Sequence, residues 1–111
     1  MIVGIGCDIV KIERMRSFVE NKKKLVFLTE KEQALCKDFP LERKVEWLAG
    51  RFAAKEAIFK AIHTQFHCTI FDFEILSNKD GAPTCQIDGY HIHLSIAHEK
   101  EYAIAYALIE K

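Results

Sequence analysis

Two carboxylate residues lie in segments of this chain that otherwise read as protein core. Asp8 interrupts the apolar run over residues 2–10, and Glu56 lies in the mostly apolar stretch over residues 51–60. Burial of a carboxylate is unfavourable unless a cation, a hydrogen-bond donor or a metal compensates it. Strand alternation puts Gly4 and Gly6 on the same face as Asp8, so we expect space for a ligand beside its carboxylate. Simpler readings stay open: Asp8 can cap a helix or turn, and Glu56 can pair with Lys60.

A row of cations accompanies Glu56. Arg51 and Lys55 are four residues apart, and like charges at that spacing destabilise a helix unless an anion lies near them. Lys60 follows them, and Arg43 and Lys44 come earlier in the same predicted helix. Arg and Lys both suit phosphates, Arg through paired donors and Lys as a point charge. Since Mg²⁺ takes few protein carboxylates and completes its shell with water and phosphate oxygens, the set predicts a Mg²⁺–polyphosphate site and phosphoryl-type transfer.

His98 stands at the end of a predicted strand. An imidazole there can contact a phosphate or transfer a proton near neutral pH. A histidine in such a position is more often structural or solvent-facing, so both readings are kept.

Composition limits the partners and the compartment. The chain has 16 Lys and Arg against 16 Asp and Glu, which gives no overall field for a nucleic acid or a membrane surface. Residues 11–24 are locally basic, a patch that suits an acidic partner, although a solvated helix face would look the same. The cysteines form no C-x-x-C pair, and no apolar run reaches transmembrane length or reads as a signal peptide. We therefore expect reduced thiols in a cytoplasmic protein.

The element pattern predicts one α+β domain over residues 1–111, with an antiparallel sheet packed around a long central helix. Helical apolar spacing and the capping pair of Thr29 and Glu32 predict helices over residues 12–20, 29–36 and 41–62. Alternation between turn residues predicts strands over residues 2–9, 71–76, 83–87, 91–98 and 102–109. The apolar helix faces exceed what so few strands can cover, which indicates an oligomer.

Several segments occur in the order typical of one family. They are Ile5-Gly6-Cys7-Asp8-Ile9, the block from Trp47 to Ala57 with Phe59-Lys60, Asn78-x-x-Gly81-x-Pro83, and His93-Leu94-Ser95-Ile96-Ala97-His98 before an alanine-rich last strand. On these segments the chain resembles the holo-[acyl-carrier-protein] synthases, the small bacterial 4′-phosphopantetheinyl transferases. The resemblance covers essentially the whole chain.

The resemblance implies transfer of the 4′-phosphopantetheine arm of coenzyme A to a serine hydroxyl of apo acyl carrier protein, in fatty-acid biosynthesis, with release of adenosine 3′,5′-bisphosphate. It also implies a homotrimer with active sites between subunits. Asp8 and Glu56 match the Mg²⁺ ligands, and Lys60 matches a residue near the pyrophosphate. Arg51, Pro83 and His98 fall in segments lining the coenzyme A cleft, and Arg43 and Lys44 would reach its 3′-phosphate. The first helix would dock the acidic carrier protein through Lys11, Arg14 and Arg16.

The chemical roles follow from that scheme. Lys60 and His98 would stabilise charge on the leaving group, while the base that takes the serine proton stays open between Glu99 and a water held by Asp8 or Glu56. The alternative function is a non-catalytic trimeric module that binds a nucleotide or an acidic protein. An RNA-binding module is disfavoured by the neutral charge and by the lack of an aromatic, basic sheet.

Overall fold

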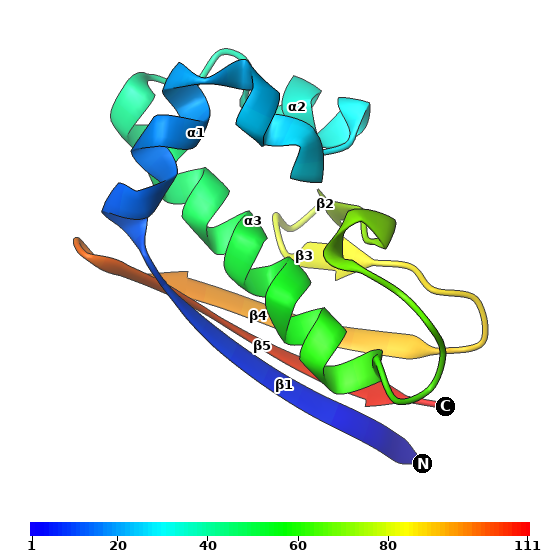
Figure 1. The fold of residues 1–111 in the computed structure, drawn as a ribbon. Coiled ribbons are helices and arrows are strands. Elements are labelled where there is room, and N and C mark those ends of the chain that lie inside the picture. The colour runs from blue at the N-terminus through cyan, green and yellow to red at the C-terminus, as the bar shows by residue number, and fades with distance from the viewer.

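The computed structural model describes the backbone of residues 1–111 and all side chains except those of residues 22–24. Its main sheet has three antiparallel strands in the order β1 (Ile2–Lys11), β5 (Tyr102–Glu110), β4 (His91–His98). The long helix α3 (Leu41–Ile62) lies along one face of that sheet (Figure 1). A short hairpin of β2 (Ile75–Ser77) and β3 (Pro83–Cys85) forms a second sheet. The predicted α+β architecture around a central helix is therefore confirmed.

Glycines on β1 let the helix approach the strand closely. A Cβ added at Gly4 would lie 1.8 Å from the carbonyl oxygen of Ala61, and one at Gly6 would lie 2.0 Å from that of Ala57. Strand alternation predicted that both glycines lie on one face of the strand, and that face packs against α3. The prediction that they leave room for a ligand is wrong, because the backbone of the helix occupies that space.

The segment between β1 and α3 differs in part from the prediction. A single helix was expected over residues 12–20, but the structure has the 3₁₀ turn η1 (Ile12–Met15) followed by α1 (Arg16–Glu20). The 3₁₀ helix η2 (Lys22–Phe27) follows, and then α2 (Glu30–Cys36). Both halves of the capping box form: the Glu32 amide donates to Thr29 Oγ1 (3.2 Å), and the Thr29 amide donates to Glu32 Oε1 (2.9 Å). The predicted start of that helix is confirmed.

The strand expected over residues 71–76 is mostly absent. Residues 70–72 form the 3₁₀ turn η3 (Ile70–Asp72), and β2 begins only at Ile75. A local capping box explains the difference, since the amide of Thr69 donates to Asp72 Oδ2 at 2.7 Å. The predicted turn over residues 78–81 does form, with Gly81 at a φ of +85°. The strand expected over residues 83–87 ends at Cys85.

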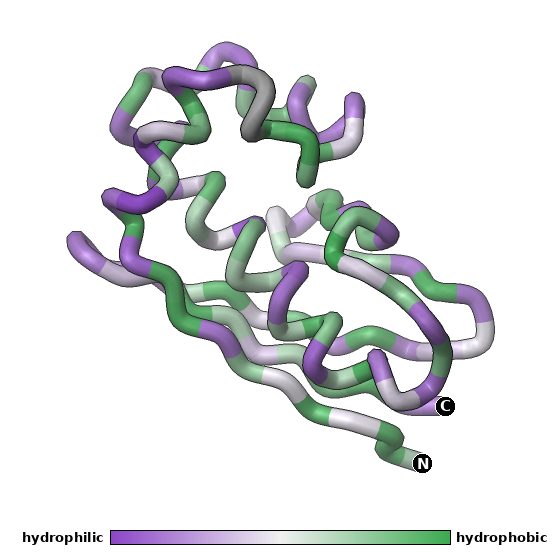
Figure 2. The backbone as a smooth tube through the Cα atoms, in the orientation of Figure 1, coloured by the Kyte–Doolittle hydropathy of each residue, from purple (hydrophilic) through white to green (hydrophobic). Residues whose placement is uncertain are grey.

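The sheet has one covered and one open face. Alanines of β5 point at α3 and are buried, while Ile5 and Ile9 on the other face of β1 are 68% and 61% exposed. Tyr106, which pairs with Cys7 across the two strands, is 58% exposed on the same open face. Hydrophobic residues recur along all three strands (Figure 2). None of the helices in the described part of the chain is long and apolar enough to cross a membrane.

Candidate functional site

A first cluster of charges lies where α3 crosses β1. The Lys60 ammonium donates to Asp8 Oδ1 and to the carbonyl oxygen of Cys7, both at 3.1 Å. Asp8 lies within β1, so it does not cap a helix. Its side chain is 17% exposed, whereas that of Lys60 is 51% exposed. Although Lys60 ends the stretch over residues 51–60 that reads as protein core, its ammonium stands at the open edge of the cluster.

Glu56 completes this cluster one helical turn before Lys60. Burial raises the pKa of its carboxyl, and the charge of Asp8 raises it further, while Lys60 acts in the opposite direction. The two carboxylates therefore repel each other, and one cation offsets them only in part.

That donor set fits Mg²⁺. No group of three or more His, Cys, Asp or Glu side chains able to hold a metal exists among the described residues, so Asp8 and Glu56 would be the protein's whole contribution. Mg²⁺ commonly binds through one or two carboxylates and takes its other ligands from water and phosphate. Asp8 and Glu56 would hold the ion, and Lys60 would stand beside its other ligands.

A second cluster lies at β4, the edge strand on the other side of β5 from β1. Glu46 of α3 accepts from Arg43 Nη1 at 3.0 Å, and its Oε1 lies 3.4 Å from Nε2 of His98, at the end of β4. All three side chains keep 31–47% of their surface exposed. The arrangement gathers two groups that can bind anions around a single carboxylate. Glu46 was not among the predicted site residues, although its position three residues after Arg43 on a helix was a usable signal.

Arg51 supplies the buried part of this second cluster. It is 7% exposed, and its guanidinium lies 4.6 Å from the centre of the Trp47 ring. Nη2 donates to Ser77 Oγ at 3.3 Å, and among the described side chains Nε is the buried nitrogen or oxygen without a hydrogen-bond partner. Burial lowers the pKa of the guanidinium, with Glu32 acting in the opposite direction. A guanidinium so poorly satisfied favours an anionic ligand. Pro83 pairs with Ser77 in the hairpin and so borders this position.

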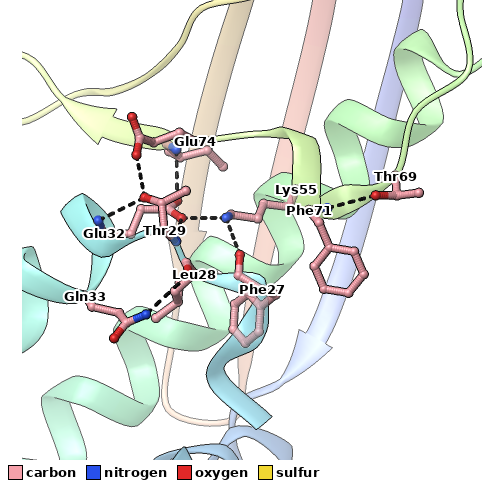
Figure 3. Close-up of polar contacts among 10 residues, drawn as sticks. Phe27, Leu28, Thr29, Glu32, Gln33, Lys55, Thr69, Phe71 and Glu74 are labelled. Atoms are coloured by element: carbon pink, nitrogen blue, oxygen red, sulfur yellow. Dashed lines mark hydrogen bonds and ion pairs between the residues drawn. The ribbon is translucent and has the colours of Figure 1, made fainter. Parts of the chain in front are cut away.

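Lys55 does not belong to the row of phosphate-binding cations. Its side chain is fully buried, and Nζ donates to Glu32 Oε1 at 2.6 Å and to the carbonyl oxygen of Phe27 at 2.5 Å. Figure 3 shows the ammonium between these two acceptors. The spacing of Arg51 and Lys55 predicted an anion near them, and the anion beside Lys55 is the chain's own Glu32. Lys55 therefore anchors α2 to α3 and leaves Lys60 and Arg51 for a ligand.

The remaining predicted residues are dispersed. Lys44 borders a separate hollow of about 210 Å³ with Cys36 and Lys37. Glu99 lines a hollow of about 360 Å³ with His98 on the open side of the sheet. Neither residue enters the first cluster.

The predicted docking residues differ in their surroundings. Lys11 and Arg14 are exposed. Arg16 is held by the carboxylates of Glu13 and Glu42, at 2.7 Å and 2.9 Å. The other basic residues of the patch, 22–24, lie outside the described side chains.

The two clusters occupy opposite edges of one sheet. Asp8 lies on β1 and His98 on β4, and β5 separates these strands. Glu56 and Lys60 accompany Asp8, while Arg43, Arg51 and Pro83 lie on the side of β4, against which β3 packs. The structure thus brings the predicted residues together as two groups.

Comparisons with known proteins point to one family. The family model of the 4′-phosphopantetheinyl transferase superfamily matches residues 4–107. The chain is 46% identical over 117 residues to the holo-[acyl-carrier-protein] synthase of Geobacillus kaustophilus, covering 100% of this chain and 91% of that protein. It is 44% identical over 116 residues to the same enzyme of Oceanobacillus iheyensis, covering 99% of this chain and 98% of that protein.

Solved structures extend the likeness to three dimensions. A crystal structure of a holo-(acyl-carrier-protein) synthase from Bacillus anthracis in complex with CoA (3′,5′-ADP) has a TM-score of 0.88 and 38% identity, covering 98% of this chain and 96% of that chain. The Helicobacter pylori holo-[acyl-carrier-protein] synthase in complex with coenzyme A has a TM-score of 0.76 and 29% identity, covering 96% of this chain and 99% of that chain.

Proposed function

This chain belongs to the 4′-phosphopantetheinyl transferase superfamily, and we propose that it moves the 4′-phosphopantetheine arm of coenzyme A onto a serine hydroxyl of apo acyl carrier protein, releasing adenosine 3′,5′-bisphosphate. It is an enzyme, a phosphopantetheinyl transferase. The observation that carries the proposal is the group of Asp8, Glu56 and Lys60 at the edge of β1, in a chain with relatives of this activity along its whole length. A module that only binds a nucleotide does not need such a pair of carboxylates.

The side chains of the first cluster suit the reacting centre. Mg²⁺, when bound, would neutralise charge on the pyrophosphate and so favour departure of the bisphosphate. Asp8 and Glu56 would hold it, because their mutual repulsion is relieved by a dication. The Lys60 side chain is 51% exposed, and its hydrogen bond to Asp8 is 3.1 Å long. The ammonium can therefore turn from Asp8 towards a pyrophosphate oxygen. Lys60 would thus stabilise charge on the leaving group.

The side chains of the second cluster suit the rest of coenzyme A. Arg51 is fixed against Trp47, and its Nε has no hydrogen-bond partner among the described residues, which favours contact with a phosphate. Arg43 and His98 are solvent-accessible and can contact a second anionic group, with Lys44 next to Arg43. Glu99 stays a candidate base for the serine proton, as does a water held by Asp8 or Glu56.

We propose that one complete site needs two copies of the chain, in a homotrimer. The two clusters lie on different strands of one copy, β1 and β4, with β5 between them, and the family resemblance implies active sites between subunits. A head-to-tail contact between the β1 edge of one copy and the β4 edge of the next would join them, and such a contact forms a ring when its rotation closes. Ring closure would also cover the apolar open face of Ile5, Ile9 and Tyr106. The family resemblance sets the number of copies at three.

We place this reaction in the cytoplasm. The four cysteines are free, as expected where thiols stay reduced, and residues 1–111 would act as one domain.

The test is to incubate the purified protein with apo acyl carrier protein, coenzyme A and Mg²⁺, and to weigh the carrier by mass spectrometry. We expect a gain of one phosphopantetheine that disappears on chelation of Mg²⁺ and in D8N. Binding of coenzyme A without any transfer would favour the non-catalytic module, and absence of both would refute the proposal.

The shared site has its own test. D8N and H98A each damage one edge of the sheet, so each is expected to be nearly inactive alone. After subunit exchange, a mixture should recover part of the activity, because some interfaces combine an intact β1 edge with an intact β4 edge. Without recovery, although exchange is verified by mass, the site would lie within one subunit.

A further inference from the structure

Arg16 is the most fully bonded cation on the surface of this protein that the structure describes. Its Nε and Nη2 donate to the two oxygens of Glu13 at 2.7 Å and 3.2 Å. Its Nη1 and Nη2 donate to the two oxygens of Glu42 at 2.9 Å each. Both carboxylates are therefore bound through paired donors, the strongest geometry available to arginine. Glu13 lies in η1 and Glu42 in the first turn of α3, so the guanidinium joins the start of both elements.

This cluster, which we call the Arg16 clamp (Arg16, Glu13, Glu42), is open to water. The side chains of Arg16, Glu13 and Glu42 are 29%, 64% and 77% exposed. The hydrogen bonds to Arg16 lower the pKa of both carboxyls, and those carboxylates in turn raise the pKa of the guanidinium. All three groups stay charged around neutral pH. Because these groups are exposed, water and salt screen their attraction, and a carboxylate from outside the chain can compete for the guanidinium.

The clamp changes the charge of the surface that we propose for docking. Lys11, Arg14 and Arg16 would form a row of three cations, yet two carboxylates accompany Arg16 and leave the clamp with a net charge of about −1 by formal count. On this surface Lys11 and Arg14 are exposed to a partner, whereas Arg16 is already paired with two carboxylates.

Glu42 is the carboxylate that can leave the clamp most easily. It is the more exposed of the two, so its carboxylate regains water on release. It also lies in the first turn of the 22-residue helix α3, where the helix dipole favours a negative charge even without Arg16. An incoming carboxylate would thus exchange one bidentate bond for another.

We infer that Glu13 and Glu42 bind the Arg16 guanidinium at the positions that carboxylates of an acidic protein partner would take. Docking then requires a carboxylate of the partner to displace Glu42. The inference rests on the proposed function, in which that partner is apo acyl carrier protein. The clamp selects for a carrier that presents a carboxylate able to bind both guanidinium nitrogens. It also weakens docking of carriers that offer only scattered negative charge.

The experiment compares steady-state kinetics of wild type, E42Q, E13Q and E20Q, with apo acyl carrier protein varied at saturating coenzyme A and Mg²⁺. We expect E42Q to lower the KM for the carrier about two- to five-fold, because Arg16 is then freed from one competitor. E20Q is the matched control: it removes one exposed carboxylate from α1 that takes no part in the four hydrogen bonds of Arg16 given above. Its effect on the KM should be smaller.

A double-mutant cycle separates release of Arg16 from a general change in charge. In an R16Q background, E42Q should no longer lower the KM, since there is no guanidinium to release. An equal gain in both backgrounds would overturn the inference, as would an unchanged or raised KM in E42Q. If the wild-type protein does not modify the carrier at all, the proposed function fails first and the docking inference falls with it. Wild-type turnover with no effect of E42Q refutes the clamp alone.

Discussion

Removal of Lys55 should destabilise the fold far more than removal of any surface charge. Both partners of the Lys55–Glu32 pair are fully buried. Loss of one member of a buried ion pair leaves the other charge without compensation and typically costs about 3–5 kcal/mol. In K55M the methionine fills most of the volume, and Glu32 keeps two backbone donors, the amides of Thr29 and Ile75, both at 2.9 Å. We therefore expect K55M near the lower end, about 3 kcal/mol.

Loss of Glu32 should be worse. In E32L the buried ammonium of Lys55 keeps, among the described contacts, the carbonyl oxygen and the ring of Phe27, and the amides of Thr29 and Ile75 lose their acceptor. We expect E32L to lose about 4–5 kcal/mol, a large part of the stability of a domain this size. The double variant K55M/E32L should lose less free energy of unfolding than the sum of the two single variants, because it leaves no unpaired charge of this pair in the core.

The assay is urea unfolding followed by the fluorescence of Trp47, the single tryptophan of the chain, which is 8% exposed. All variants must be compared at one protein concentration, since an oligomer gains stability with concentration. K44M is the matched control, because it removes a lysine of the same helix that is half-buried. A K55M protein as stable as K44M, or additive losses in the double variant, would refute the reasoning.

Four further outcomes follow from the described contacts. G6A should lose several kcal/mol or fail to fold, because its Cβ would lie 2.0 Å from the carbonyl oxygen of Ala57; thermal unfolding measures it. The raised pKa of Glu56 means that the native state binds its proton more tightly than the unfolded chain, so this carboxyl makes stability fall as pH rises above about 4.5. The Tm of E56Q minus the Tm of wild type should therefore be larger at pH 7 than at pH 4. The same difference at both pH values would contradict that sign. Mg²⁺ should raise the Tm of wild type but not of D8N, measured without substrate. Burial raises the pKa of Cys85 to about 11, so mass spectrometry after iodoacetamide at pH 8 should find it unmodified in the folded protein.

Local signals predicted the regular elements well and the irregular ones poorly. The helix over residues 41–62 and the strand over residues 91–98 have the predicted bounds, because long periodic patterns outweigh single residues. Residues 70–72 became a 3₁₀ turn because Thr69 and Asp72 satisfy each other's backbone locally, which alternation of apolar residues does not register. In this segment the strand propensity of the apolar residues competes with local side-chain to backbone hydrogen bonds, and the hydrogen bonds determine the structure.

The site could be predicted as a list of residues but not as an arrangement. Asp8, Glu56 and Lys60 do gather, since strand alternation and helical spacing fix the faces that they share. Their separation from His98 depends on the strand order, with the last strand inserted between the first and the fourth, and no short pattern encodes that insertion. The same limit hid the partner of Lys55, which comes from a helix 23 residues earlier.

The neighbours Lys55 and Glu56 show how one helix serves both the fold and the chemistry. Successive residues on a helix point about 100° apart, so the fully buried ammonium of Lys55 and the carboxylate of Glu56 in the first cluster can be adjacent in sequence. The carboxylate of Glu32 satisfies Lys55 within the protein, whereas the repulsion between Glu56 and Asp8 is left unresolved until a cation from outside binds. That difference decides which charge the folded protein needs for itself. A charge already satisfied within the chain stabilises the fold, and a charge that folding leaves unsatisfied is available to bind a ligand.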